Sequence, residues 1–146
     1  MDSYPSTVIW TGSTAGRDFN RDAVASAPGK PEIAVSAGTA NAACWNPEDM
    51  LCASLSTCHM LTFLALASKV GIDVRQYEGH AEAILETEDK ITRVTRIRLT
   101  PRITVAAGSD EFKVGMMFEK AHRYCFIGNS LTSEVEMVPE IVVLAA

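Results

Sequence analysis

The sequence predicts an α+β fold with antiparallel sheets packed around one long central helix, and three observations indicate it. Residues 47 to 70 form one long apolar segment with helical signals at both ends. Segments of β type precede and follow this helix. A second stretch with helical spacing separates the later β segments, so the order is β, helix, hairpin, helix, β. The length of 146 residues indicates a single domain over residues 1–146.

The first forty residues contain two short segments of β type. TVIW, at residues 7–10, is apolar and β-branched, and PEIAVSAG, at residues 31–38, predicts a second short strand. Between them, residues 12–30 are rich in Gly, Ser, Ala, Asp and Pro. Because these residue types favour turns, we expect a loop or an irregular hairpin there.

The central helix has clear start and stop signals. Asn46 suits the N-cap, and Pro47 suits the first helical position because its missing N–H is not needed there. Glu48 and Asp49 place negative charge at the positive end of the helix dipole. Gly71 can adopt the left-handed conformation that ends a helix. Its apolar residues lie too widely around the axis for a surface helix, so we expect burial on most sides.

The segments after the helix predict a β-hairpin and a final β segment. Residues 72–88 and 91–107 are extended, the second with apolar alternation, and Glu-Asp-Lys between them suits a turn. Pro101 cannot donate to a strand ladder, which indicates an edge position or a bulge. Residues 133–144 form the last segment of β type.

The second helix is predicted within residues 110–125. Helical spacing there makes Phe112, Met116 and Ala121 the candidate inward positions, followed by Tyr124 or Cys125.

The composition excludes several classes of partner. The formal net charge of -5 gives no electrostatic basis for binding nucleic acid or an anionic membrane. No uninterrupted apolar run reaches the roughly 18 residues that span a bilayer. The first residues lack the basic start and apolar stretch of a secretion signal. We therefore expect a cytoplasmic protein whose four cysteines are mostly reduced.

Cys58 and Cys125 are the candidate reactive residues. A free cysteine in an apolar helix is usually a small hydrophobic residue, and this is the expected role of Cys58 when it is considered by itself. One thiol in each of two helices is, however, an arrangement that allows a reversible disulfide, with one sulfur oxidised by a peroxide and the other resolving it. Together with His59 and His122 the two cysteines form a possible zinc ligand set, but no recognised ligand spacing supports a metal site.

A reactive Cys58 needs a nearby cation that favours the thiolate, and arginine is the natural choice because it is never neutral. Glu48 is a candidate to orient that guanidinium, although a glutamate in a first helical turn stabilises the dipole in any case. Ten residues of helix separate Glu48 from Cys58, which is about 15 Å along the axis. If both serve one site, a second, antiparallel copy of the helix must supply one of them, at a twofold interface.

Two segments resemble the OsmC/Ohr family of osmotically inducible and organic hydroperoxide resistance proteins. They are NPEDMLCASLSTCHMLTFLALASKVGIDVRQYEGHAEAIL and AHRYCFIGNSL. The first resembles most closely the branch whose helix carries Ser-x-Cys-His-Met. The resemblance covers about residues 40 to 135 well, and the first 40 residues loosely.

This resemblance implies an OsmC-like fold in an intertwined homodimer, with active sites at the interface between subunits. It implies a cysteine peroxidase in which Cys58 attacks the peroxide, Cys125 resolves it and Glu48 is the family's glutamate. FNRD, at residues 19–22, is similar to the Tyr-Ser-Arg-Asp stretch of the branch and points to Arg21 as the arginine. Phe in place of Tyr, and Ala where His is common, leave Arg17 as the alternative.

The resemblance also implies which small molecules the protein meets. The substrate is an organic hydroperoxide, no resident cofactor is implied, and an external dithiol restores the thiols, of the lipoyl type in the Ohr relatives. Two other interpretations stay open: a dimer that binds a hydrophobic ligand without turnover, and a redox sensor that uses the same disulfide for signalling.

Overall fold

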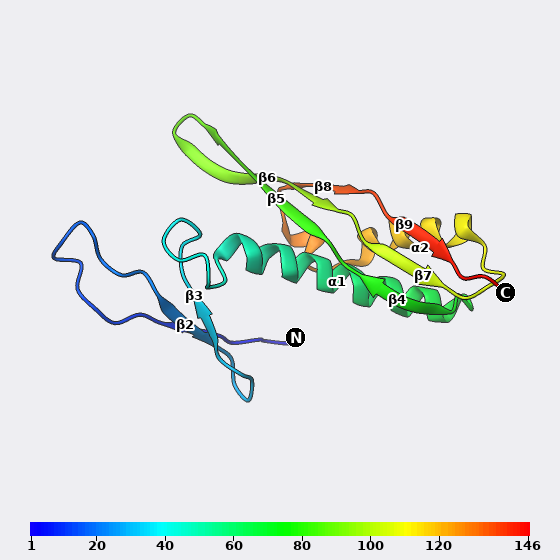
Figure 1. Cartoon of the computed structure of the whole chain (residues 1–146), viewed down its shortest axis with the longest axis horizontal. Helices are drawn as coiled ribbons and strands as arrows, with labels where there is room; N and C mark the ends of the chain where they lie inside the picture. The colour runs from blue at the N-terminus through cyan, green and yellow to red at the C-terminus, as the bar shows by residue number, and fades with distance from the viewer. The chain divides into compact units, whose positions relative to one another are not determined.

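A computed structural model describes all 146 residues of the chain, and the chain contacts divide it into two compact units (Figure 1). The first unit comprises residues 1–50 and the second comprises residues 51–146. Each unit is described by itself below. The single domain expected from the length stays a prediction.

The first unit contains a three-stranded antiparallel sheet. Its strands, in the order β1-β2-β3, are β1 (Thr7–Ile9), β2 (Ala23–Ser26) and β3 (Ile33–Val35). The expected strands at residues 7–10 and 31–38 are confirmed. The stretch expected to be a loop or irregular hairpin contains β2, which pairs with both neighbours. Four apolar residues of this sheet are exposed: Val8, Ile9, Val24 and Ile33.

Helix α1 (Pro47–Lys69) begins and ends as the sequence predicts. The Asn46 side chain accepts a hydrogen bond from the Asp49 N–H at 2.8 Å, and the Asp49 carboxylate accepts one from the Asn46 N–H at 3.1 Å. This reciprocal pair satisfies two backbone donors at the helix start. At the other end Gly71 has φ +78°, and the Ile72 N–H donates to the Ala67 carbonyl at 2.9 Å. This geometry ends the helix and satisfies carbonyls of its last turn.

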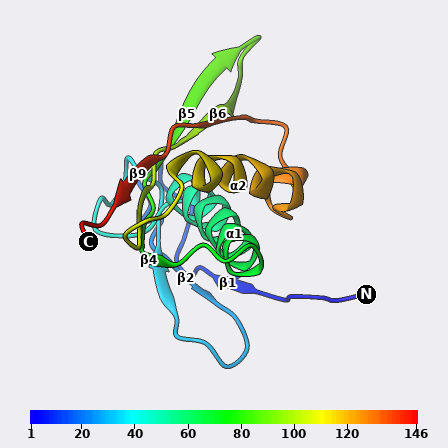
Figure 2. The same cartoon turned by 90° about the vertical axis from the view of Figure 1, so that its right-hand side faces the viewer.

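The second unit has two three-stranded sheets, which follow one another along three ribbons and carry both helices on one side (Figures 1 and 2). Each ribbon consists of two successive strands separated by a short break: β4 (Val74–Glu78) and β5 (Ala81–Glu88), β6 (Ile91–Leu99) and β7 (Arg102–Val105), β8 (Glu134–Met137) and β9 (Glu140–Val143). The strand orders are β4-β7-β9 and β5-β6-β8.

Two pairings in these sheets differ from the antiparallel arrangement that the sequence predicts. β4 pairs with β7 and β5 with β6 in antiparallel fashion, as expected for a hairpin. β8 pairs with β6, and β9 with β7, in parallel. The reason is that a helix intervenes before the last ribbon and carries the chain back to the start of β6, and such a crossover makes neighbouring strands parallel.

Pro101 lies neither on a sheet edge nor at a bulge, the two positions that its missing donor predicts. It is buried at the break between β6 and β7, in the central ribbon. Its carbonyl accepts a hydrogen bond from the Glu140 N–H at 2.9 Å. The break removes the need for a donor at this position, so the proline is tolerated in the central ribbon. At the other end of β6, Asp89 and Lys90 have φ of 51° and 66° and form the predicted tight turn.

Helix α2 (Glu111–Tyr124) buries a different stripe from the one expected. The Asp110 side chain caps its N-terminus by accepting hydrogen bonds from two backbone N–H groups. The buried positions of α2 are Val114, Phe118 and Ala121, and Cys125 directly after the helix is buried too, so Ala121 and Cys125 are confirmed among the expected positions. Phe112 and Met116 are 76% and 47% exposed.

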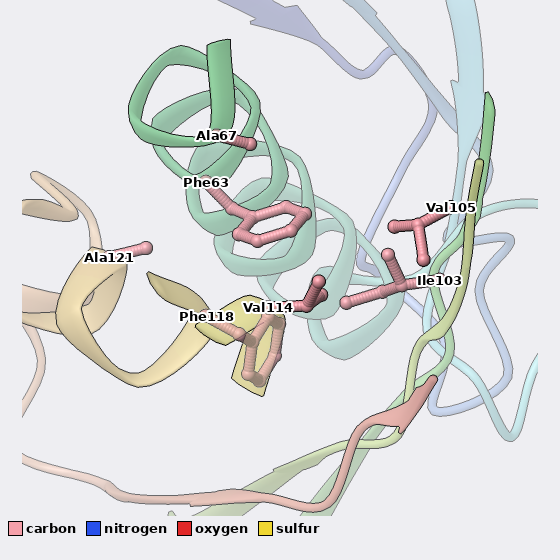
Figure 3. Packing of buried hydrophobic residues seen from close by; sticks show 7 residues of the cluster. All are labelled: Phe63, Ala67, Ile103, Val105, Val114, Phe118 and Ala121. Carbon is pink, nitrogen blue, oxygen red and sulfur yellow. The ribbon is translucent and has the colours of Figure 1, made fainter. Parts of the chain in front are cut away.

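The core of the second unit consists of two clusters. In the first, α1, α2 and β7 meet, with Phe63 and Phe118 lying between the helices and the strand in Figure 3. Its buried members are Phe63, Ala67, Ile103, Val105, Val114, Phe118 and Ala121. The second cluster has Leu55, Ile97, Leu99 and Cys125 as its buried members. Cys125 follows α2 and precedes a short 3-10 helix, η1 (Gly128–Ser130).

Candidate functional site

The two cysteines singled out by the sequence meet in the second cluster. Cys58 lies on α1 and is half-buried, whereas Cys125 at the end of α2 is fully buried. Both thiols are free, and the two side chains are close enough to interact, since burial and the neighbouring Cys58 side chain both raise the pKa of Cys125. Two segments far apart in the sequence thus bring one cysteine each to the same cluster.

Cys125 owes its position to the way α2 ends. It is the C-cap residue, with extended backbone angles of φ -74° and ψ 112°, and its N–H donates to the His122 carbonyl at 3.4 Å. The chain then turns back, and the Gly128 N–H donates to Cys125 Sγ at 3.4 Å. Burial raises the pKa of the Cys125 thiol, the Gly128 N–H opposes that rise, and the neighbouring Cys58 side chain adds to it.

Two imidazoles, the buried His59 of α1 and the half-buried His122 of α2, lie close together beside the first cluster. His59 is fully buried, and its ring lies 4.3 Å from the Phe118 ring and 6.4 Å from the His122 ring, centroid to centroid. Neither nitrogen of His59 has a hydrogen-bond partner, and Nδ1 of His122 has none. Two causes lower the pKa of His59 to about 4: burial is the larger, and the neighbouring His122 is the smaller. The nearby Phe118 backbone opposes this shift. His59 is therefore neutral at physiological pH.

The candidate zinc ligands do not form a metal site in this chain. No group of three or more His, Cys, Asp and Glu side chains converges on a point that would hold an ion. Cys58 and Cys125 belong to one cluster, whereas His59 packs against Phe118 of the other. Residues 58 and 59 thus point to different neighbours, as their spacing on a helix predicts.

The other predicted site residues, Arg21 and Glu48, belong to the first unit. The Arg21 guanidinium lies over the Phe19 ring, 5.3 Å from its centroid, and Phe19 in turn contacts Trp10 edge-on. This stacking fixes the exposed arginine locally. Arg17 is exposed in the connection between β1 and β2, and Glu48 is in the first turn of α1. The roles of Arg21, Arg17 and Glu48 stay predictions.

Gly128 was not predicted as a residue of the site. A Cβ at this position would lie 3.4 Å from Cys125 Sγ and 3.5 Å from His122 Cε1. The glycine therefore borders both the thiol and the imidazole. The only trace in the sequence is its place three residues after Cys125, and such a spacing is too common to identify a site residue.

The family comparison identifies one model that matches most of the chain. The model for OsmC-like proteins matches residues 38–140. These residues include Cys58, Cys125, Glu48 and the two helices. A search of curated proteins finds no match.

Comparison with solved structures gives the same fold. An OsmC-like protein of unknown function from Vibrio cholerae is 29% identical, with a TM-score of 0.86 over 97% of this chain and 100% of that one. An organic hydroperoxide resistance protein from Elizabethkingia anophelis is 19% identical, with a TM-score of 0.74 over 99% and 98% of the two chains. The organic hydroperoxide resistance protein OhrB of Bacillus subtilis is 18% identical, with a TM-score of 0.67 over 96% and 98%.

Proposed function

Because the chain belongs to the OsmC-like family, we propose that it is a thiol peroxidase that reduces organic hydroperoxides to alcohols. The observation that carries this proposal is the contact between two reduced thiols, Cys58 and Cys125, in a largely apolar cluster. Some solved structures of the same fold are of organic hydroperoxide resistance proteins, which supports the choice of substrate.

The proposed reaction has two steps on the protein. The Cys58 thiolate attacks the terminal oxygen of the hydroperoxide, the O–O bond breaks, and the alcohol leaves after taking up a proton. Cys58 is thereby oxidised to a sulfenic acid. Cys125 then attacks the Cys58 sulfur, the S–S bond forms, the S–O bond breaks, and water leaves. An external dithiol reduces the disulfide by thiol–disulfide exchange.

The half-buried position of Cys58 suits the first step. A hydroperoxide must reach this sulfur, whereas Cys125 needs only to reach Cys58. We assign Arg21 the task of favouring the Cys58 thiolate, with Arg17 as the alternative, and Glu48 the task of orienting the guanidinium. No resident cofactor is needed for either step.

The test is the disulfide itself. After one equivalent of cumene hydroperoxide, peptide mass spectrometry should find Cys58 linked to Cys125. Cys58→Ser should lower hydroperoxide consumption to the level of dithiol alone, and Cys125→Ser should leave a sulfenic acid on Cys58 that dimedone traps. Cys44→Ser, outside the cluster, is the matched control and should keep the wild-type rate.

Three results separate this proposal from its rivals. Hydroperoxide consumption by Cys58→Ser at the wild-type rate would falsify it. A wild type that forms the disulfide but never turns over with any dithiol would favour a redox sensor. A link from Cys58 to Cys52 would contradict both the assignment and the helix, because six residues of α1 put these two about 9 Å apart along the axis.

We also propose that the protein is a homodimer through α1. By length and composition α1 would pass for a membrane-spanning helix, and 22% of its most apolar window is buried within the chain. Residues 50–68 contain no Asp, Glu, Lys or Arg, and Leu61 is 58% exposed. A surface helix normally carries charges on its outer face. A second copy of α1 would cover this face in a soluble, cytoplasmic protein.

The dimer has its own test. Light scattering during size exclusion should give twice the mass of the 146-residue chain. Leu61→Arg should shift the particle toward the monomer mass, because it places a charge in the proposed interface. Leu85→Arg, at a leucine that is 50% exposed on the β5–β6 hairpin, should leave the mass unchanged. A monomeric wild type would contradict the proposal.

A further inference from the structure

His59 and His122 place nitrogen atoms in the protein interior in a way that packing alone does not explain. Burying a hydrogen-bonding group without a partner destabilises the folded state. His59 leaves both nitrogens unpaired, and His122 leaves one. An apolar side chain would fill the space against Phe118 without that cost. Buried polar groups without partners therefore point to a use.

Cys125 has a need that such a group would meet. To attack an oxidised Cys58 it must lose its proton, since only the thiolate is a nucleophile. Its thiol is fully buried, and burial raises its pKa. The N–H groups of Gly128 and Ile127 favour the thiolate but cannot accept a proton. The attack thus requires a proton acceptor near this sulfur.

His122 borders the same residue, Gly128, as Cys125, and its Nδ1 has no hydrogen-bond partner, so it is available to accept a proton. It lies in the last turn of α2, three residues before Cys125. Gly128 borders both residues, with its Cβ position 3.4 Å from Cys125 Sγ and 3.5 Å from His122 Cε1. Gly128 therefore has no side chain that would separate the thiol from the imidazole.

We propose that His122 takes the proton that Cys125 releases when it attacks the oxidised sulfur of Cys58. Where that oxidised sulfur is a sulfenic acid formed by a hydroperoxide, this inference rests on the function proposed above. The Cys125 S–H bond breaks, the proton passes to the His122 imidazole, and the S–S bond forms as the Cys58 S–O bond breaks. The departing hydroxide takes the proton back from His122 and leaves as water, so the imidazole is neutral again after each cycle.

His59 is not the acceptor, because burial first and the neighbouring His122 second lower its pKa to about 4. The other neighbours of Cys125 leave His122 as the base. From α1, the thiols of Cys52 and Cys58 belong to the same cluster as Cys125, and Cys58 interacts with it. The sheet contributes apolar residues to the cluster, and the Arg123 guanidinium lies over the Tyr124 ring.

The experiment measures the attack by Cys125 without any peroxide. In a Cys44→Ser, Cys52→Ala background, Cys58 is converted to its mixed disulfide with thionitrobenzoate. Attack by Cys125 on Cys58 then releases the coloured thiol, which stopped-flow absorbance follows between pH 5 and pH 9. His122→Gln should slow this release about 100-fold at pH 7, the lower end of general-base effects. The inflection in the imidazole range should disappear from its pH profile.

His59→Gln is the matched control, since it makes the same change at the more buried ring. It should stay within about threefold of the unsubstituted background, as expected if His122 alone receives the proton. Equal slowing by both glutamine variants would overturn the proposal, because lost packing would do the same. An unchanged rate and pH profile in His122→Gln would overturn it as well.

Two further outcomes keep the inference apart from the peroxidase activity. If His122→Gln does not fold, the pH profile of the protein with both histidines decides: a rise without an inflection in the imidazole range contradicts the role of His122. If hydroperoxide turnover is absent but release depends on His122, the peroxidase proposal fails and this one stands. If turnover is present but release ignores His122, the reverse holds.

Discussion

Replacing Phe118 by alanine is expected to lower the free energy of unfolding by about 4 kcal/mol, the middle of the range for a fully buried phenylalanine. The Phe118 ring has no exposed surface and contacts both His59, at 4.3 Å, and Phe63, at 5.9 Å between centroids. Its removal leaves a cavity where α1, α2 and β7 meet, at the centre of the first cluster (Figure 3). Urea unfolding followed by circular dichroism measures the loss.

Phe112→Ala is the control for this prediction. The same residue type in the same helix is 76% exposed, so we expect a change within about 0.5 kcal/mol. Similar losses for the two variants would show that the inward stripe of α2 is wrongly assigned. The sequence alone assigns Phe112 to the inward stripe of α2, so the expected difference between the two variants is the opposite of what the sequence predicts.

Acidification is expected to destabilise the protein through His59. The unfolded imidazole has a pKa of 6.5 and the folded one of about 4. Between these values the unfolded chain binds more protons, so stability is complete above pH 6.5 and is lost as the pH falls through the folded pKa. A shift of this size corresponds to about 3 kcal/mol at pH 4, of which about 2 kcal/mol is lost by pH 5.

His59→Leu isolates this contribution, because carboxylates also titrate near pH 4. The free energy of unfolding of the variant, minus that of the wild type, should grow by about 2 kcal/mol between pH 7.5 and pH 5. His80→Gln, at a histidine that is 60% exposed, should show no such growth. A difference that stays flat for His59→Leu would mean that the buried ring accepts a proton without penalty.

Most positions of helices and strands follow from local signals in the sequence, whereas the pairing of strands and the buried face of a helix do not. The Asn46 cap, Pro47 and Gly71 define α1 because caps depend on a few adjacent residues. The parallel pairing of β8 and β9 depends on where α2 returns the chain, which no strand encodes. α2 has two apolar stripes, and contact with α1 and β7 decides which one is buried.

The candidate site shows the same division. Cys58 and Cys125 are visible as a pair of thiols in two helices, and the structure brings them together. His59 lies in the most deeply buried stripe of α1, with Leu55, Phe63 and Ala67. A polar residue there interrupts the apolar pattern, so periodicity conceals its burial. Only the packing of α1 against α2 reveals that His59 and His122 form a pair.

The order of the elements has a consequence for how the protein is made. α1 ends at residue 69, and every strand that covers its buried stripe follows it in the chain. A ribosome needs on the order of ten seconds to add the remaining residues. For that time α1, which has no charged residue between positions 50 and 68, is without its sheet. We therefore expect a nascent-chain chaperone to shield α1 until translation ends.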